Sequence, residues 1–221
     1  LIAYSFTDVL TGLPNRRAIF EDLNTLFSLG RHLKRNVIIA FIDLDDFKRI
    51  NDQYGHEAGD QFLIEVGKRL SDEKTEDEII GRLGGDEFLV ACLSKAENQA
   101  DEGQINLLRA RLRDRIAGQY GLGSVSIVYP GASLGVVEVD PAGMDPDSAL
   151  RVADVAMYQD KKGKGKTRFH VLDYPRTLYG ILKTQTGDGM RIGILFPVVI
   201  FITAVVFLAW FFVGGYAAPG A

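Results

Sequence analysis

The stretch Ile79-Ile80-Gly81-Arg82-Leu83-Gly84-Gly85-Asp86-Glu87-Phe88-Leu89-Val90 decides the fold of this chain. Apolar, β-favouring residues lie on both sides of a glycine pair, which predicts two strands joined by a tight hairpin turn. Asp86 and Glu87 follow at the start of the return strand. Glycine lets the backbone approach a phosphate closely, and neighbouring carboxylates can hold a divalent cation. The pattern therefore indicates metal-assisted chemistry on a nucleotide.

The composition of the chain limits its class. It has 221 residues and a net charge of -4, so we expect no nucleic-acid partner. About 170 residues have ordinary soluble composition, enough for one domain with a real core. Cys92 is the single cysteine, which excludes an intramolecular disulfide, and its apolar surroundings predict a buried core thiol. Because the chain starts with Leu1, we expect an upstream part that holds a regulatory domain.

The C-terminal part has a different composition. Residues 192–213 contain no charged side chain and have the length of a membrane-spanning helix. Arg176, Lys183 and Arg191 precede this segment and no Lys or Arg follows it, which predicts a cytoplasmic location for the rest of the chain. We expect a domain at 1–173, a linker at 174–191, a transmembrane helix at 192–213 and a short tail at 214–221. The alternative is a buried helix of a larger assembly.

Helical and strand patterns alternate along the first 173 residues. Apolar spacing predicts helices around 19–27, after Pro14 in a first turn, and around 47–54, 62–70, 105–116 and 148–161. Strands are expected at 37–42, in the hairpin, at 132–139 and at 168–172. This order predicts an α+β fold, with a mixed, mostly antiparallel sheet flanked by helices. It can be drawn as a ferredoxin-like core with additions.

Two acids would converge at one edge of the sheet if the first apolar strand and the return strand of the hairpin are neighbours. Asp43 ends the first apolar strand and Asp86 follows the glycine pair. Either acid alone is an ordinary cap or turn residue, but together at one edge they suit Mg²⁺, which prefers oxygen ligands and shares them with phosphates. A helix starting near Asp45 would offer backbone N–H groups to a phosphate, and Lys48 lies in its first turn.

A base-recognition pair is also conceivable. The amide of Asn51 both donates and accepts, and the carboxylate of Asp60 can accept from a guanine N–H. The alternatives are helix capping for Asn51, turn formation for Asp60, and an ordinary loop or capping role for His56.

Several ordered motifs resemble the GGDEF family of diguanylate cyclases over roughly residues 1–173. They are DVLTGLPNRR from Asp8, FIDLDDFKRIND from Phe41, YGH from Tyr54, GD from Gly59, GGDEF from Gly84, SLGV from Ser133 and ADVAMY from Ala153. The resemblance implies a ferredoxin-like, nucleotidyl-cyclase palm. It also implies condensation of two GTP into cyclic di-GMP with release of two pyrophosphates, between two facing copies of the domain.

The resemblance assigns roles residue by residue. Asp43, Asp86 and the Leu44 carbonyl would bind two Mg²⁺ (or Mn²⁺) in each half-site. Lys48 would stabilise phosphate charge, and either Asp86 or Glu87 would take the hydroxyl proton. The substrate-binding residues would be Asp46, Phe47, Asn51, His56, Asp60, Leu63, Gly84, Gly85 and Lys161. Asp60 favours synthesis of a product that contains guanine only, whereas a serine at this position would favour mixed dinucleotide products.

Two departures from the family pattern stand out. The product-inhibition motif Arg-x-x-Asp corresponds to residues 75–78, which lack the arginine, so we expect no feedback inhibition through that site. An extra residue near the C-terminal phosphate-binding lysine leaves Lys161 and Lys162 as alternatives. The leading interpretation is a homodimeric, GTP-converting enzyme anchored in the bacterial inner membrane with its catalytic domain in the cytoplasm. A silent domain that senses GTP or cyclic di-GMP, or a dimerisation scaffold, are the alternatives.

Overall fold

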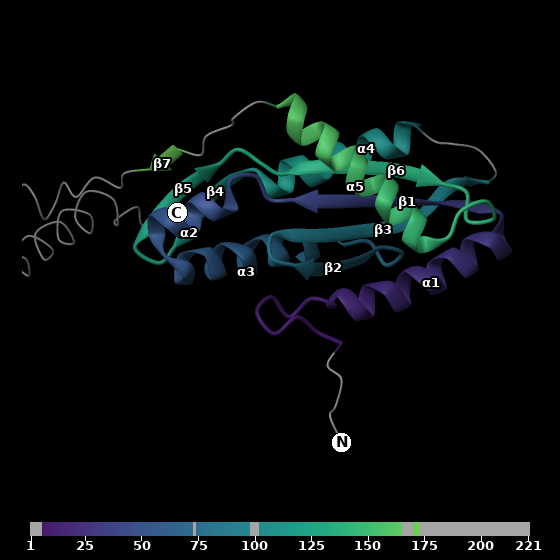
Figure 1. The fold of residues 1–221 in the computed structure, drawn as a ribbon, viewed down its shortest axis with the longest axis horizontal. Coiled ribbons are helices and arrows are strands. Elements are labelled where there is room, and N and C mark those ends of the chain that lie inside the picture. The colour runs from purple at the N-terminus through teal and green to yellow at the C-terminus, as the bar shows by residue number, and fades with distance from the viewer. Residues whose placement is uncertain (1–5, 73, 98–101, 165–169, 173–221) are drawn as a thin grey trace, which may run out of the picture. The chain divides into compact units, whose positions relative to one another are not determined.

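A four-stranded antiparallel sheet forms the centre of the protein. The computed structural model describes residues 6–72, 74–97, 102–164 and 170–172. The sheet order is β2 (Ile79–Gly84), β3 (Glu87–Glu97), β1 (Arg35–Asp43) and β6 (Ser133–Val139), as Figure 1 shows. Each of these strand pairs is antiparallel. The expected α+β class is confirmed, whereas the parallel component of a mixed sheet is absent from the described strands.

The chain connectivity is ferredoxin-like. Helices α2 (Phe47–Tyr54) and α3 (His56–Asp72) connect β1 to β2, and α4 (Glu102–Ile116) lies between β3 and β6. Each of these connections skips one position in the sheet, and another strand occupies that position. β3 lies between β1 and β2, and β1 lies between β3 and β6. Because β1 pairs antiparallel with β3, the acid that ends β1 and the acids at the β2–β3 turn meet at the same edge of the sheet.

Helices cover both faces of the sheet. Helices α1 (Arg16–Leu33) and α5 (Pro146–Gly163) pack on one face, and α3 and α4 pack on the other. Figure 1 shows α5 lying across β1 and β6. Along β1, the odd-numbered residues of 37–41 contribute to the α1–α5 side of the core and the even-numbered residues of 38–42 to the α3–α4 side. Burial on both faces explains why β1 reads as one continuous apolar run.

A second, smaller sheet was not expected in full. It consists of β4 (Gly118–Leu122), β5 (Val125–Tyr129) and β7 (His170–Leu172), and only β7 corresponds to a predicted strand. Alternating burial of Tyr120 and Leu122 is a period-two strand signal, but glycines between and after them weaken it. Short, glycine-containing strands of this kind are stabilised by their packing more than by their own sequence.

Three local predictions need correction. The first turn of α1 does not contain Pro14, because the helix begins at Arg16 and Asn15 caps it by accepting from the Ala18 N–H. Helix α2 begins at Phe47, after a left-handed residue, so the turn from Asp45 is not helical. Asp86 lies in the hairpin turn, and only Glu87 belongs to the return strand.

Cys92 is buried in the sheet, as predicted, and burial raises the pKa of its thiol to about 11. No helix among the residues that the structure describes is long and apolar enough to cross a membrane. The predicted linker, transmembrane helix and tail (174–191, 192–213 and 214–221) lie outside the described residues, and those boundaries stay predictions.

Candidate active site

The ends of β1 and of the hairpin form one acidic edge. Asp43 is the last residue of β1 and lies opposite Glu87 in the antiparallel register. The Leu44 N–H donates to the Asp86 carbonyl at 3.1 Å, which ties the turn after β1 to the hairpin turn. Gly84 and Gly85 have φ values of 138° and 54°, a region that glycine enters without strain. The structure thus brings Asp43, Asp86 and Glu87 together.

The acids at this edge repel one another. Burial first, and then the charge of Asp43, raise the pKa of Asp86 above its ordinary value. Burial also raises the pKa of Glu87, and the charges of Asp43 and Asp86 add to that rise. A bound cation would relieve this repulsion, because an opposite charge within a few ångströms favours the ionised carboxylate.

Lys161 supplies a positive charge from the last turn of α5. Its Nζ lies 2.6 Å from Oδ1 of Asp43. Burial alone would lower the pKa of Lys161, but the hydrogen bond to Asp43 and the nearby charges of Asp45 and Asp86 outweigh it, and the pKa is raised. Lys162 instead lies over the Tyr158 ring, 4.4 Å from its centroid. Of the two alternatives, the structure places Lys161 at the acidic edge.

The donor set at this edge fits Mg²⁺ or Mn²⁺. Asp43 and Asp86 offer carboxylate oxygens. The carbonyl of Leu44, the residue after Asp43, offers a third oxygen, which accepts a long 3.4 Å hydrogen bond from the Phe47 N–H. In the described ranges no three His, Cys, Asp or Glu side chains form a complete metal cluster. Mg²⁺ takes few protein carboxylates and completes its shell with phosphate oxygens and water, so two carboxylates and one carbonyl could hold it here.

The remaining predicted residues lie on α2 and α3. Lys48 and His56 are exposed, each near the start of its helix. A Cβ added at Gly59 would lie 1.9 Å from Oδ1 of Asn51, so this glycine, which precedes the exposed Asp60, makes room for the Asn51 amide. By contrast, Leu63 is only 2 % exposed and packs in the core, where it can offer little surface to a nucleotide.

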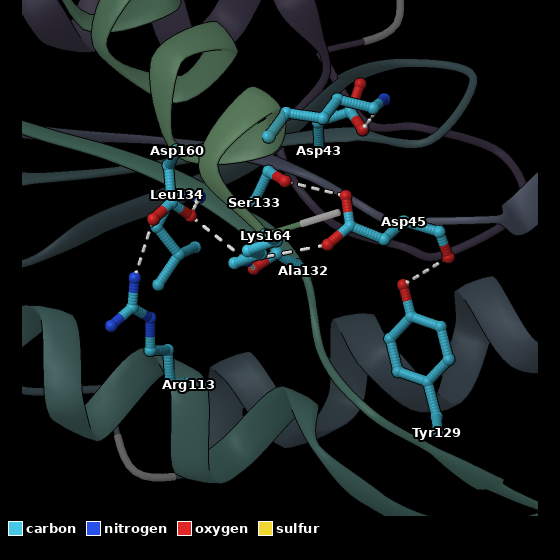
Figure 2. Close-up of polar contacts among 10 residues, drawn as sticks. Asp43, Asp45, Arg113, Tyr129, Ala132, Ser133, Leu134, Asp160 and Lys164 are labelled. Atoms are coloured by element: carbon cyan, nitrogen blue, oxygen red, sulfur yellow. Dashed lines mark hydrogen bonds and ion pairs between the residues drawn. The ribbon is translucent and has the colours of Figure 1, made fainter. Parts of the chain in front are cut away.

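A polar network behind the acidic edge was missed by the sequence analysis. Figure 2 shows Asp45 held from two sides. Its Oδ1 accepts from the Ser133 hydroxyl at 2.6 Å, and its backbone carbonyl accepts from the Tyr129 hydroxyl at 2.8 Å. Lys164 reaches both Asp45 and Asp160, the latter at 3.0 Å, and donates to the Ala132 carbonyl.

A second missed contact holds the hairpin from the N-terminal side. The Arg82 guanidinium pairs with Asp8 at 2.9 Å and donates to the Gly85 carbonyl at 2.7 Å. Burial alone would raise the pKa of Asp8, but the hydrogen bonds from Thr11 and Arg82 outweigh it and lower that pKa. The partners are 74 positions apart, so no local pattern indicates the pair.

The fold and this edge together define a palm-like α+β domain whose carboxylates converge beside a glycine hairpin. The family profile described as "Diguanylate cyclase, GGDEF domain" matches residues 5–167. The chain therefore belongs to the GGDEF family of diguanylate cyclases. A second profile, "Small membrane protein YoaK", matches residues 190–221.

Individual relatives agree with this family. Diguanylate cyclase DgcP of Escherichia coli K12 is 60 % identical over 169 residues, which are 76 % of this chain and 48 % of DgcP. The chain thus spans about half the length of that relative. A sensory box/GGDEF protein from Caulobacter crescentus superposes with a TM-score of 0.65 at 31 % identity, covering 72 % of this chain and 99 % of that one.

A further solved structure is diguanylate cyclase SiaD from Pseudomonas aeruginosa in complex with its activator SiaC. It superposes with a TM-score of 0.65 at 30 % identity, covering 72 % of this chain and 59 % of that one.

Proposed function

We propose that this chain is an active diguanylate cyclase, which condenses two GTP into cyclic di-GMP and releases two pyrophosphates. The observation that carries the proposal is the convergence of Asp43, Asp86 and Glu87 at one sheet edge, with Lys161 bonded to Asp43. The 60 % identity to DgcP, which is named a diguanylate cyclase, supports the same activity.

Each residue of the edge has a task in this reaction. Asp43, Asp86 and the Leu44 carbonyl would hold Mg²⁺ or Mn²⁺, and the bound metal would lower the pKa of the 3′-hydroxyl and neutralise the triphosphate. Asp86 or Glu87 would accept the hydroxyl proton; burial, and then the neighbouring carboxylates, raise the pKa of each carboxyl, which makes it a stronger base than an isolated exposed carboxylate. Lys161 and Lys48 offset charge on the leaving pyrophosphate during in-line displacement.

Guanine recognition is assigned to the α2–α3 side. Asn51 would bind the base edge with Asp60, and His56 would flank it. The backbone at Asp46 and Phe47, where α2 begins, would face the phosphates. The Asp46 side chain makes no cap hydrogen bond to the first N–H groups of this helix, so it does not occupy them.

One copy of this edge would hold one GTP, so two copies must face each other for either phosphodiester bond to form. The purified chain of residues 1–221 in detergent, given GTP and Mg²⁺, should release pyrophosphate and cyclic di-GMP. Because the active species is a dimer, the initial rate should rise with the square of the protein concentration when that concentration is far below the dimer dissociation constant. Nucleotide binding without turnover would instead identify a sensor, and neither would identify a scaffold.

We also propose that residues 192–213 anchor the chain in the inner membrane with the catalytic domain on the cytoplasmic side. The uncharged segment and the match of residues 190–221 to a small membrane protein profile support this. Carbonate extraction of the expressed chain tests it: release into the soluble fraction would contradict an integral anchor.

A further inference from the structure

The turn between β1 and α2 needs support from outside itself. It carries the two ligand candidates Asp43 and the Leu44 carbonyl, and it then passes through Asp46 at φ 58° and ψ 20°. A non-glycine residue in this left-handed region is strained, and such strain persists only where surrounding structure holds it. The contacts that hold this turn therefore decide where its oxygen ligands lie.

One of these contacts comes from the second sheet. The Tyr129 hydroxyl donates to the Asp45 carbonyl at 2.8 Å, from the last residue of β5 (Figure 2). Tyr129 is 1 % exposed, and its ring packs edge-on against Phe62 with centroids 4.7 Å apart. A ring fixed in this way can hold its hydroxyl in one place.

A second set of contacts comes from β6 and α5. One carboxylate oxygen of Asp45 accepts from the fully buried Ser133 hydroxyl, and the other lies 3.5 Å from Nζ of Lys164. Ser133 is also the register neighbour of Asp43 on β6. Both carboxylate oxygens of Asp45 are thus engaged by protein donors, so Asp45 fixes the turn and does not serve as a ligand.

We propose that Tyr129 is a positioning residue for the metal ligands, acting through the Asp45 carbonyl, and that Asp45 and Ser133 anchor the same turn on its other side. This rests on the proposed function, since it assigns the metal site to Asp43, Leu44 and Asp86. The hydrogen bonds immobilise the peptides that follow Leu44, and so set the direction of the Leu44 carbonyl. Metal sites depend on such outer contacts to pre-organise their ligands.

Tyr120 provides a matched control. It is fully buried in the same aromatic cluster, and its hydroxyl also donates to a backbone carbonyl, that of Ile116 at 2.7 Å. Tyr129→Phe and Tyr120→Phe each remove one buried hydroxyl of the same kind. Of these two tyrosines, only Tyr129 bonds to the turn after the proposed ligands Asp43 and Leu44, so a purely structural role would affect both variants alike.

The test compares the two variants in the chain of residues 1–221. The readouts are the Mg²⁺ and Mn²⁺ concentrations that give half-maximal rate, and the rise in unfolding midpoint produced by Mn²⁺ with a GTP analogue carrying an α,β-methylene bridge. We expect Tyr129→Phe to raise the half-maximal metal concentration by about 10-fold or more, the range for outer contacts of metal sites. Tyr120→Phe should lower the unfolding midpoint but keep the wild-type metal dependence.

Equal metal dependence of the two variants would overturn the proposal. If Tyr129→Phe does not fold, Ser133→Ala is measured in its place, because that change removes the hydroxyl that donates to the Asp45 carboxylate. A wild-type metal dependence in Ser133→Ala would also overturn the proposal. A wild-type chain that binds the analogue but does not turn over GTP would count against the proposed function alone, since the unfolding readout still compares the variants.

Discussion

At the scale of single residues, the carboxylates of the acidic edge that suit cation binding also lower the stability of the folded state. Asp86 is partly buried beside Asp43, and burial first, and then the charge of Asp43, raise its pKa above the ordinary value. A site built to bind a cation is destabilised without it, which is a general reason why functional residues oppose stability. The Asp86 side chain therefore allows activity and stability to be separated experimentally.

Asp86→Asn should lower the turnover rate by more than about 100-fold, because it removes a direct ligand, whereas losing an outer contact of a metal site costs up to roughly 100-fold. In metal-free buffer at pH 7 the same change should raise the unfolding midpoint by roughly 1–3 °C, because the folded state no longer contains the repelled charge. Calorimetry with and without Mg²⁺ measures this. Full activity of the variant would show that Asp86 is not a ligand.

The pH dependence of that stability difference has a definite sign. Because the pKa of Asp86 is higher in the folded state than in the unfolded state, the folded state holds the proton more tightly, and stability falls as pH rises through the interval between the two values. The advantage of Asp86→Asn should be full above this interval and disappear below about pH 4, where the carboxyl is protonated in both states. An advantage that grows on acidification would contradict this cause.

The two adjacent lysines at the end of α5 give a second prediction. Lys161→Ala removes the charged hydrogen bond to Asp43 and should lower kcat/KM by roughly 10- to 100-fold, the equivalent of about 1.5–3 kcal/mol for such a bond. Lys162→Ala removes a side chain that lies over Tyr158 and should leave kcat/KM near the wild-type value. Steady-state kinetics of both variants decides the register; the reverse outcome would place Lys162 in the site.

At the scale of elements, the position of α5 depends on a glycine in β6. A Cβ added at Gly135 would lie 2.0 Å from the Ala153 carbonyl oxygen and 2.4 Å from the Met157 nitrogen. Both atoms belong to the backbone of α5, so the helix itself would have to move. The same helix carries Lys161 and is capped by Lys164, so this close approach sets how far those lysines reach toward the acidic edge.

Gly135→Ala should therefore destabilise the fold by roughly 1–3 kcal/mol, as overpacking does, and lower activity more than stability alone explains. Gly121→Ala is the matched control, because Gly121 also lies in a strand, has no atom within 4 Å of an added Cβ, and needs no left-handed backbone. Urea unfolding and initial rates of both variants measure the effects. Equal stabilities would show that α5 can shift without cost.

At the scale of the whole molecule, the region that corresponds to the family's product-inhibition motif is engaged internally. Glu78 is buried, pairs with Arg111 of α4 and accepts from the Thr75 N–H at 3.2 Å. The arginine of the motif is replaced by Thr75, and the carboxylate at the other end is already neutralised by the chain's own arginine. An external ligand would have to displace that pair.

Added cyclic di-GMP should therefore leave the initial rate of the chain of residues 1–221 unchanged at concentrations that do not compete with GTP. Initial rates at several GTP concentrations separate competition at the active site from inhibition elsewhere. As a control, Glu78→Gln removes the carboxylate charge that pairs with Arg111 and should lower stability without creating inhibition. Strong noncompetitive inhibition of the wild-type chain would contradict the prediction.

The sequence by itself determined the helices and strands with strong periodicity, the acid that ends the first strand and the acids after the glycine pair, and the family. These depend on local patterns: a buried strand reads as an apolar run, and a helix face repeats every three to four residues. Only the tertiary structure decided that Lys161 meets Asp43 across 118 positions, that β4 and β5 form a second sheet, and that Tyr129 and Ser133 hold the turn at Asp45. Such contacts form when packed helices and strands bring side chains from distant positions together, and the spacing of residues along the chain does not predict that packing.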